Sequence, residues 1–140
     1  MKSDLFFSEG SRPAEYSLVF ATGGVLYYAI EMLWRGHSHF FMALLGGACF
    51  TFLYFLAGAF PHMSITLYCI IGGLAITLAE LAAGELLNNL LGLDIWNYSN
   101  VPLNFRGQIC LLFSFLWCLI CLPSFFLAGQ IRRRIFGYEN

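Results

Sequence analysis

Four long apolar runs dominate the sequence and restrict what the chain can fold into. They cover residues 15–33, 40–60, 65–91 and 107–129. Each is close to or above the roughly 20 residues that an α-helix needs to cross the hydrocarbon core of a bilayer. Because that core offers no water to backbone groups, such runs fold as helices that satisfy their own hydrogen bonds. The sequence therefore predicts an all-α, polytopic membrane bundle with four transmembrane helices.

The composition supports the membrane class. Of 140 residues, 59% are hydrophobic and 11% are charged, whereas soluble domains have about 25% charged residues. The net charge of −1 gives no reason to expect nucleic acid as a partner; the expected partner is the lipid bilayer. We expect a polar or interfacial segment at 1–14, the transmembrane domain at 15–131, and a basic tail at 132–140. The five cysteines lie in apolar runs and are expected to be packing residues, with no cofactor indicated.

The basic residues predict the orientation. Four spans place both termini on the same side of the membrane. That side has five basic residues and the opposite side has two; they are Lys2, Arg12, Arg132, Arg133 and Arg134 against Arg35 and Arg106. An excess of Lys and Arg marks the cytoplasmic side, so we expect a multi-pass cell-membrane protein with both termini in the cytoplasm. Residues 132–134 are also suited to contact anionic lipids.

The third run contains the strongest candidate for a functional site. Glu80, Gly84 and Asn88 are spaced by four residues and so share one helix face, with Glu85 beside it. A carboxylate inside an apolar segment is costly unless it is paired, and by default it indicates function. Glu80 is therefore predicted to exchange a proton or bind a cation; the alternative is a buried structural hydrogen bond. Ser64 is expected to cap this helix.

Two polar connections accompany this face on the predicted outer side. The 94–106 loop is long for a connector, and its Trp96, Tyr98 and Asn104 either line a pocket or anchor the loop at the headgroups. Beside the 34–39 turn, Glu31 near the end of the first helix and Arg35 are spaced for a helical ion pair, although Arg35 could instead join Glu80. His37 and His39 are too few to predict zinc, which needs three or four ligands, so no metal site is predicted.

A longer pattern resembles a known family. It consists of Trp34-Arg35-Gly36, His39, Glu80-x3-Gly84-x3-Asn88, Trp96-Asn97-Tyr98-Ser99, Pro102, Asn104, Gly107 and Ile109-Cys110-Leu111. Over roughly residues 25–125, the chain is similar to the CmpB-like ABC-transporter family of small multi-span membrane proteins. That family usually has W-D-Y-S in the loop, where this chain has Asn97. The resemblance implies a role in transport.

The leading hypothesis is a transporter or permease component that moves or binds a small solute or ion at the outer end of the bundle. Four helices enclose little space, so we expect a homodimer or a partner membrane subunit. The candidate site residues are Glu80, Glu31, Arg35, Asn88, Glu85, His39, Trp96, Tyr98 and Asn104. Two alternatives are a non-catalytic subunit or sensor of a larger complex, and a membrane enzyme acting on lipid headgroups. The enzyme is less favoured because the sequence shows no G-x-S-x-G nucleophile elbow. It also shows no phosphate-binding loop, so ATP hydrolysis is not expected of the chain by itself.

Overall fold

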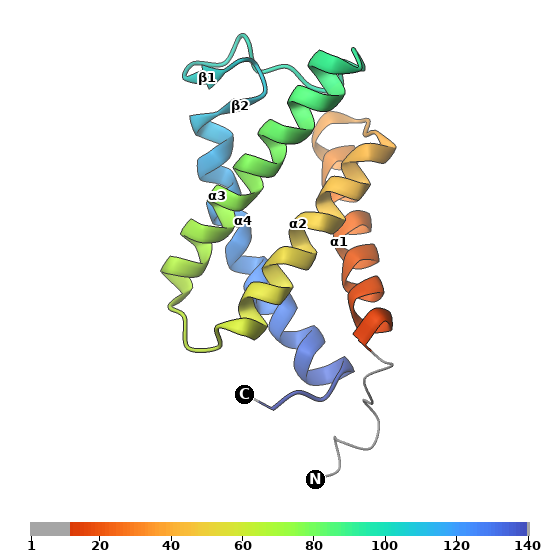
Figure 1. The fold of residues 1–140 in the computed structure, drawn as a ribbon, viewed down its shortest axis with the longest axis vertical. Helices are drawn as coiled ribbons and strands as arrows, with labels where there is room; N and C mark the ends of the chain where they lie inside the picture. Colours follow the sequence, from red (N-terminus) through yellow and green to blue (C-terminus); the bar gives the residue numbers. More distant parts are fainter. Residues whose placement is uncertain (1–11, 140) are drawn as a thin grey trace. The chain divides into compact units, whose positions relative to one another are not determined.

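A computed structural model describes residues 12–139 of the chain (Figure 1). The elements, in order, are α1 (Arg12–Arg35), α2 (Phe40–Ala59), α3 (Ile65–Gly84), the π-helix η2 (Glu85–Leu90), β1 (Asn104–Phe105), β2 (Ile109–Cys110), α4 (Leu111–Gln130) and the π-helix η3 (Ile131–Ile135). The predicted all-α architecture is confirmed. Of the predicted polar segment at 1–14, residues 1–11 lie outside the described part, and residues 12–14 begin α1.

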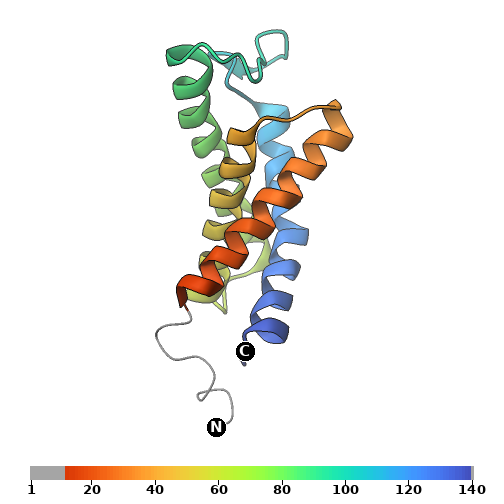
Figure 2. The ribbon, with the colours of Figure 1, turned by 90° about the vertical axis from the view of Figure 1, so that its right-hand side faces the viewer.

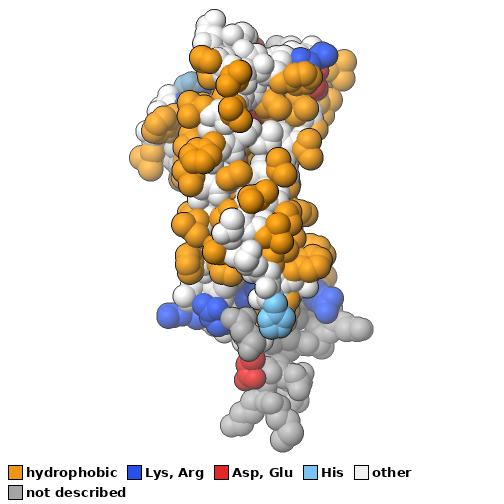
Figure 3. Space-filling model, turned by 90° about the vertical axis from the view of Figure 1, so that its left-hand side faces the viewer, with side chains coloured by type: hydrophobic (Ala, Val, Ile, Leu, Met, Phe, Trp, Pro, Cys, Tyr) orange, Lys and Arg blue, Asp and Glu red, His pale blue; other side chains and the backbone are white. Residues whose placement is uncertain are grey.

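Among residues 12–139, four helical segments are long and apolar enough to cross a membrane: Arg12–Arg35, Phe40–Ala59, Ile65–Leu90 and Leu111–Ile135. Large hydrophobic side chains on their outer faces are exposed, among them Val25, Leu78 and Phe115 at 60% or more. On the face drawn in Figure 3, hydrophobic side chains cover the helices and charged side chains gather near helix ends. This distribution suits lipid around the middle of each helix and water at its ends.

The chain divides into two compact units. Of the described residues, the first contains 12–63 and 123–139, and the second contains 64–122. The division falls within α4 at Pro123, whose ring and missing N–H interrupt the helical hydrogen bonds.

In the first unit, α1 and α2 pack side by side and are joined by the 36–39 turn (Figures 1 and 2). Their approach depends on glycine. A Cβ at Gly46 would lie 2.4 Å from Cβ of Tyr27, and one at Gly24 would lie 2.8 Å from the carbonyl oxygen of Ala43. Small residues permit this close contact between membrane helices. The buried core of the unit consists of Val19, Phe50, Tyr54, Ala128, Ile131 and Phe136.

In the second unit, α3 and the first part of α4 are tied by polar and small residues. The hydroxyl of Thr77 donates to Ser114 Oγ at 3.1 Å, and a Cβ at Gly73 would lie 2.1 Å from Cys118 Sγ. The predicted cap of α3 is confirmed, because Ser64 Oγ accepts a hydrogen bond from the backbone N–H of Leu67 at 3.2 Å.

Both predicted boundaries of the fourth helix were wrong. The fourth helix begins at Leu111 instead of 107, because residues 104–110 form an antiparallel hairpin that pairs Asn104 with Cys110 and Phe105 with Ile109. It also continues past 129 through η3 to Ile135. The third helix changes from α to π geometry at Glu85 before it ends near Gly92, which has a φ of +68°. Single-turn π segments inside helices frequently accompany functional sites.

Candidate functional site

Glu80 lies at the centre of a polar cluster in the second unit. Its side chain is buried, with 4% of the residue exposed. One carboxylate oxygen accepts a hydrogen bond from the Tyr98 hydroxyl at 2.8 Å, and the other accepts one from the Trp117 indole N–H at 2.9 Å. The ring of Tyr98 stacks on Phe113 of α4, with centroids 4.9 Å apart. The carboxylate therefore faces protein rather than lipid, and it joins α3 to the loop and to α4.

Two turns along the helix, Asn88 fastens the loop to η2. Its amide nitrogen donates to Gln108 Oε1 at 2.8 Å and to the Trp96 carbonyl at 3.1 Å, while its oxygen accepts from the N–H of Ile95 at 2.7 Å. The Trp96 indole N–H donates to the Gln108 carbonyl at 2.9 Å. A Cβ at Gly84 would lie 2.4 Å from Gln108 Oε1, so a glycine here leaves room for the amide. The predicted shared face of Glu80, Gly84 and Asn88 is confirmed.

The 97–107 part of the loop is held by its own amide side chains. Asn97 Oδ1 accepts hydrogen bonds from the N–H of Ser99 at 2.8 Å and from the Ser99 hydroxyl. An aspartate oxygen could accept the same bonds, which explains how Asn97 stands where the family usually has aspartate. Asn104 donates to the Val101 carbonyl at 2.9 Å and accepts from the N–H of Gly107 at 3.1 Å. Both residues therefore shape the loop.

Glu85 lies apart from Glu80, at the edge of this cluster. Its carboxylate forms an ion pair with Arg106 Nε at 2.7 Å, and the two side chains are 33% and 60% exposed. Exposed pairs of this kind contribute little stability, typically below about 1 kcal/mol. The pair connects η2 to the loop at a position open to solvent.

Glu31, Arg35 and His39 belong to the first unit, where they surround the 36–39 turn. Glu31 accepts a hydrogen bond from the Ser38 hydroxyl at 2.9 Å and lies 3.9 Å from Arg35 Nη2, which confirms the predicted ion pair. His39 Nδ1 accepts from the backbone N–H of Phe41 at 3.2 Å and caps α2. Participation of these three residues in a site with Glu80 stays a prediction. Within residues 12–139, no group of three or more His, Cys, Asp and Glu side chains could hold a metal ion.

Two residues of the Glu80 cluster, Gln108 and Trp117, were not predicted from the sequence. Gln108 is only 4% exposed. It lies at the start of the fourth apolar run, and a single amide among apolar residues is a feature by which the sequence could have identified it. Trp117 was one aromatic among many in that run, and its indole N–H is what distinguishes it from a phenylalanine.

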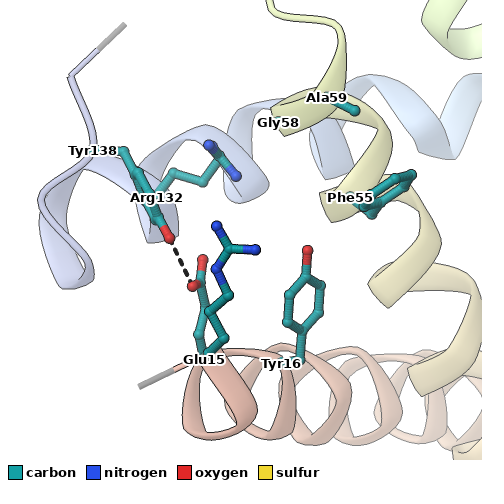
Figure 4. Close-up of a pocket in the computed structure, with 8 residues that line it drawn as sticks. Glu15, Tyr16, Phe55, Gly58, Ala59, Arg132 and Tyr138 are labelled. Atoms are coloured by element: carbon teal, nitrogen blue, oxygen red, sulfur yellow. Dashed lines mark hydrogen bonds between the residues drawn. The ribbon is translucent and has the colours of Figure 1, made fainter. Parts of the chain in front are cut away.

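Another buried carboxylate that was not predicted is Glu15 in the first turn of α1, which is 3% exposed. One of its oxygens accepts a hydrogen bond from the Tyr54 hydroxyl. The other accepts one from the Tyr138 hydroxyl at 2.9 Å, which Figure 4 marks with a dashed line. Burial, and then the bond to Glu15, raises the pKa of the Tyr138 hydroxyl, which keeps it a donor at neutral pH. Glu15 lies at the start of an apolar run, where an acidic residue is common at the end of a helix. Its position therefore did not indicate that it is buried.

These features define an integral membrane protein that has four spans in the described part of the chain, with a buried carboxylate tied to an ordered loop. Residues 14–136 match the model of the family described as "Putative ABC-transporter type IV". The chain belongs to this family, which confirms the resemblance seen in the sequence. Comparisons with curated proteins and with solved structures gave no match.

Proposed function

We propose that the protein is a membrane component of a transport system in which Glu80 binds a proton or a small cation. The observation on which this rests is a carboxylate that is 4% exposed within the Ile65–Leu90 span and accepts hydrogen bonds from two other segments. Ionisable residues at such depth are expensive and typically mark ion or substrate pathways and proton relays. Family membership supports the transport role.

The hydrogen bonds of Glu80 couple the binding of a proton or cation at its carboxylate to the loop. An ionised carboxylate only accepts hydrogen bonds, and the indole N–H of Trp117 only donates them. When a proton or cation occupies one oxygen, that oxygen becomes a poorer acceptor, and the bond from Tyr98 or Trp117 weakens. Since Tyr98 is part of the loop, binding at Glu80 would loosen or re-aim the 94–106 segment, which acts as a gate.

The remaining candidate residues have supporting roles in this proposal. Asn88 and Trp96 hold the loop against the helix, so that it responds as one body. Asn104 maintains the shape of the loop. Glu85 pairs with Arg106 at the solvent-exposed edge of the cluster and joins η2 to the loop. We place this end of the second unit outside the cell, with both termini in the cytoplasm.

Glu31, Arg35 and His39 surround the 36–39 turn of the first unit. A complete pathway would require a second copy of the chain or a partner membrane subunit. The sequence contains no phosphate-binding loop, so in an ATP-driven system the ATPase would be a separate subunit.

The test is Glu80→Gln in the purified full-length protein, reconstituted into liposomes. An entrapped pH-sensitive dye reports proton flux under an imposed potassium potential, and radioactive sodium reports sodium uptake. The substitution keeps the size of the side chain and removes its charge, so we expect flux to fall to the level of empty liposomes. The matched control is Thr77→Val, which removes another polar contact between α3 and α4, the bond to Ser114, without touching an ionisable group. It should keep flux.

Normal proton or sodium flux in Glu80→Gln would refute the proposal. A folded, flux-inactive wild type that co-purifies with a larger membrane partner, and whose Glu80→Gln variant still assembles, would favour the non-catalytic subunit. In that case the carboxylate would serve only to fasten Tyr98 and Trp117.

A further inference from the structure

The first unit contains a cavity of about 260 Å³ between the start of α1, the end of α2 and η3 (Figure 4). Its lining includes Arg12, Glu15, Tyr16, Phe55, Arg132 and Tyr138. Each of these three helical elements lies at an end of a predicted span, so the cavity opens at the depth of the lipid headgroups. It is too small for a large organic ligand and large enough for a tetrahedral oxyanion with a short substituent.

The guanidinium of Arg132 is held in this cavity by aromatic faces. Its central carbon lies 4.5 Å from the ring centroid of Tyr138 and 5.4 Å from that of Tyr54, within the range of a cation–π interaction. The hydroxyls of the same two rings donate to Glu15. A Cβ at Gly58 would lie 2.3 Å from Arg132 Nη1, so the glycine also makes room for the guanidinium. These contacts orient the guanidinium of Arg132 within the cavity.

This arrangement leaves the hydrogen-bond donors of Arg132 available. Within residues 12–139 its side chain has the two ring contacts and no carboxylate or carbonyl acceptor. The acid in the cavity does not compete for them, since each oxygen of Glu15 already accepts from a tyrosine. Arg12 contributes a second positive charge to the lining. Two positive charges and one negative charge give a net charge of +1.

We propose that this cavity binds a phosphate group, either in the headgroup of an anionic phospholipid or as soluble phosphate. A guanidinium presents paired N–H donors that match the oxygens of a phosphate. Phe55 and Tyr16 line the cavity beside the charged groups, and they suit the glycerol and upper acyl chain of a lipid. The next basic residues, Arg133 and Arg134, are exposed and would draw anionic lipid to the surface.

The test is native mass spectrometry of the full-length protein from nanodiscs that contain phosphatidylcholine mixed with phosphatidylglycerol. We expect one phosphatidylglycerol to stay bound through stepwise removal of lipid. In Arg132→Gln, its apparent affinity should fall about tenfold, the usual effect of losing one charge-assisted contact. The matched control is Arg134→Gln, which removes the same charge from the same short helix outside the cavity. It should retain the lipid.

A second variant makes the test independent of folding in Arg132→Gln. Arg12→Gln alters an exposed residue at the start of α1, so the fold is expected to persist, and lipid retention should also fall. A separate arm adds inorganic phosphate to protein in neutral detergent and measures the thermal midpoint. A rise that is lost in Arg132→Gln, without selective retention of phosphatidylglycerol, would identify soluble phosphate as the ligand. Equal losses in Arg132→Gln and Arg134→Gln, or no retention and no thermal shift in the wild type, would overturn the proposal.

Discussion

Glu15 in the first unit and Glu80 in the second are buried carboxylates that are held in nearly the same way. Glu80 is 4% exposed and Glu15 is 3% exposed. Each uses one oxygen to accept from a tyrosine hydroxyl and the other to accept from a second aromatic donor, Trp117 for Glu80 and a second tyrosine for Glu15. Hydrogen bonding alone therefore does not distinguish the two sites.

The two carboxylates differ in their position along the span and in the residues that surround them. Glu15 lies in the first turn of a span, next to a cavity that is also lined by two arginines. Glu80 lies well inside the third span, and its tyrosine donor belongs to a loop fastened by an amide network. At a span end, charges and ligands from water and headgroups are within reach. Within the span, a change in charge must be taken up by the protein itself, so we assign binding of phosphate to the first cluster and ion coupling to the second.

The largest expected effects come from neutralising each acid in turn and measuring both ion flux and lipid retention for each variant. Glu80→Gln should abolish ion flux in liposomes and leave phosphatidylglycerol retention unchanged. Glu15→Gln should keep flux and strengthen retention of the anionic lipid, because it removes the one negative charge from a cavity that binds an anion. Both measurements on both variants complete the comparison.

Each variant serves as the control for the other, since the substitution is chemically identical. If Glu15→Gln also abolished flux, the division of roles would be wrong and the two acids would act in one pathway. If it weakened lipid retention while the protein stayed folded, the carboxylate would be needed to position Tyr54 and Tyr138 more than it repels the phosphate.

The next effect concerns the glycine beside each cluster. A Cβ at Gly84 would lie 2.4 Å from Gln108 Oε1 and 2.9 Å from its Cβ, so Gly84→Ala must displace the whole side chain and should cost about 1–3 kcal/mol. At Gly58, the three nearest atoms all belong to the guanidinium end of Arg132, which can move. There, the helix preference for alanine of about 1 kcal/mol should offset the clash.

Unfolding in a detergent series, followed by tryptophan fluorescence, measures both variants. Gly58→Ala should still weaken lipid retention, because the guanidinium shifts although stability does not. The prediction fails if Gly58→Ala is the more destabilising of the two.

Much of the fold followed from the sequence because apolar length and hydrogen-bond satisfaction leave a membrane chain few options. The four spans, the Ser64 cap, the face shared by Glu80 and Asn88, and the Glu31–Arg35 pair depend on spacing along one helix, and spacing can be read directly. The position of Glu80 against protein followed from the cost of exposing a carboxylate to lipid.

The parts that escaped prediction depend on contacts between distant segments. Tyr138 bonds to Glu15 across 123 positions, and Trp117 bonds to Glu80 across 37; no periodicity connects such pairs. The start of α4 was misplaced because residues 107–110 are apolar enough to continue a helix, while the pairing of Ile109 with Phe105 and the φ of +72° at Gly107 place them in a hairpin.

The smallest expected effect comes from removing one tyrosine hydroxyl at each carboxylate. Tyr98→Phe and Tyr138→Phe each delete a hydrogen bond of 2.8–2.9 Å and keep the ring, so each should cost about 1 kcal/mol. Hydrogen exchange separates them. Tyr98→Phe should speed exchange in the loop, where the N–H of Tyr98 donates to the Gly107 carbonyl, and Tyr138→Phe should speed it where the N–H of Tyr138 donates to the Arg132 carbonyl.

Because its ring still faces Arg132, Tyr138→Phe should keep the anionic lipid, whereas Tyr98→Phe should weaken the response of the loop to pH. Lipid loss in Tyr138→Phe would mean that the hydroxyl, and not the aromatic face, positions the guanidinium.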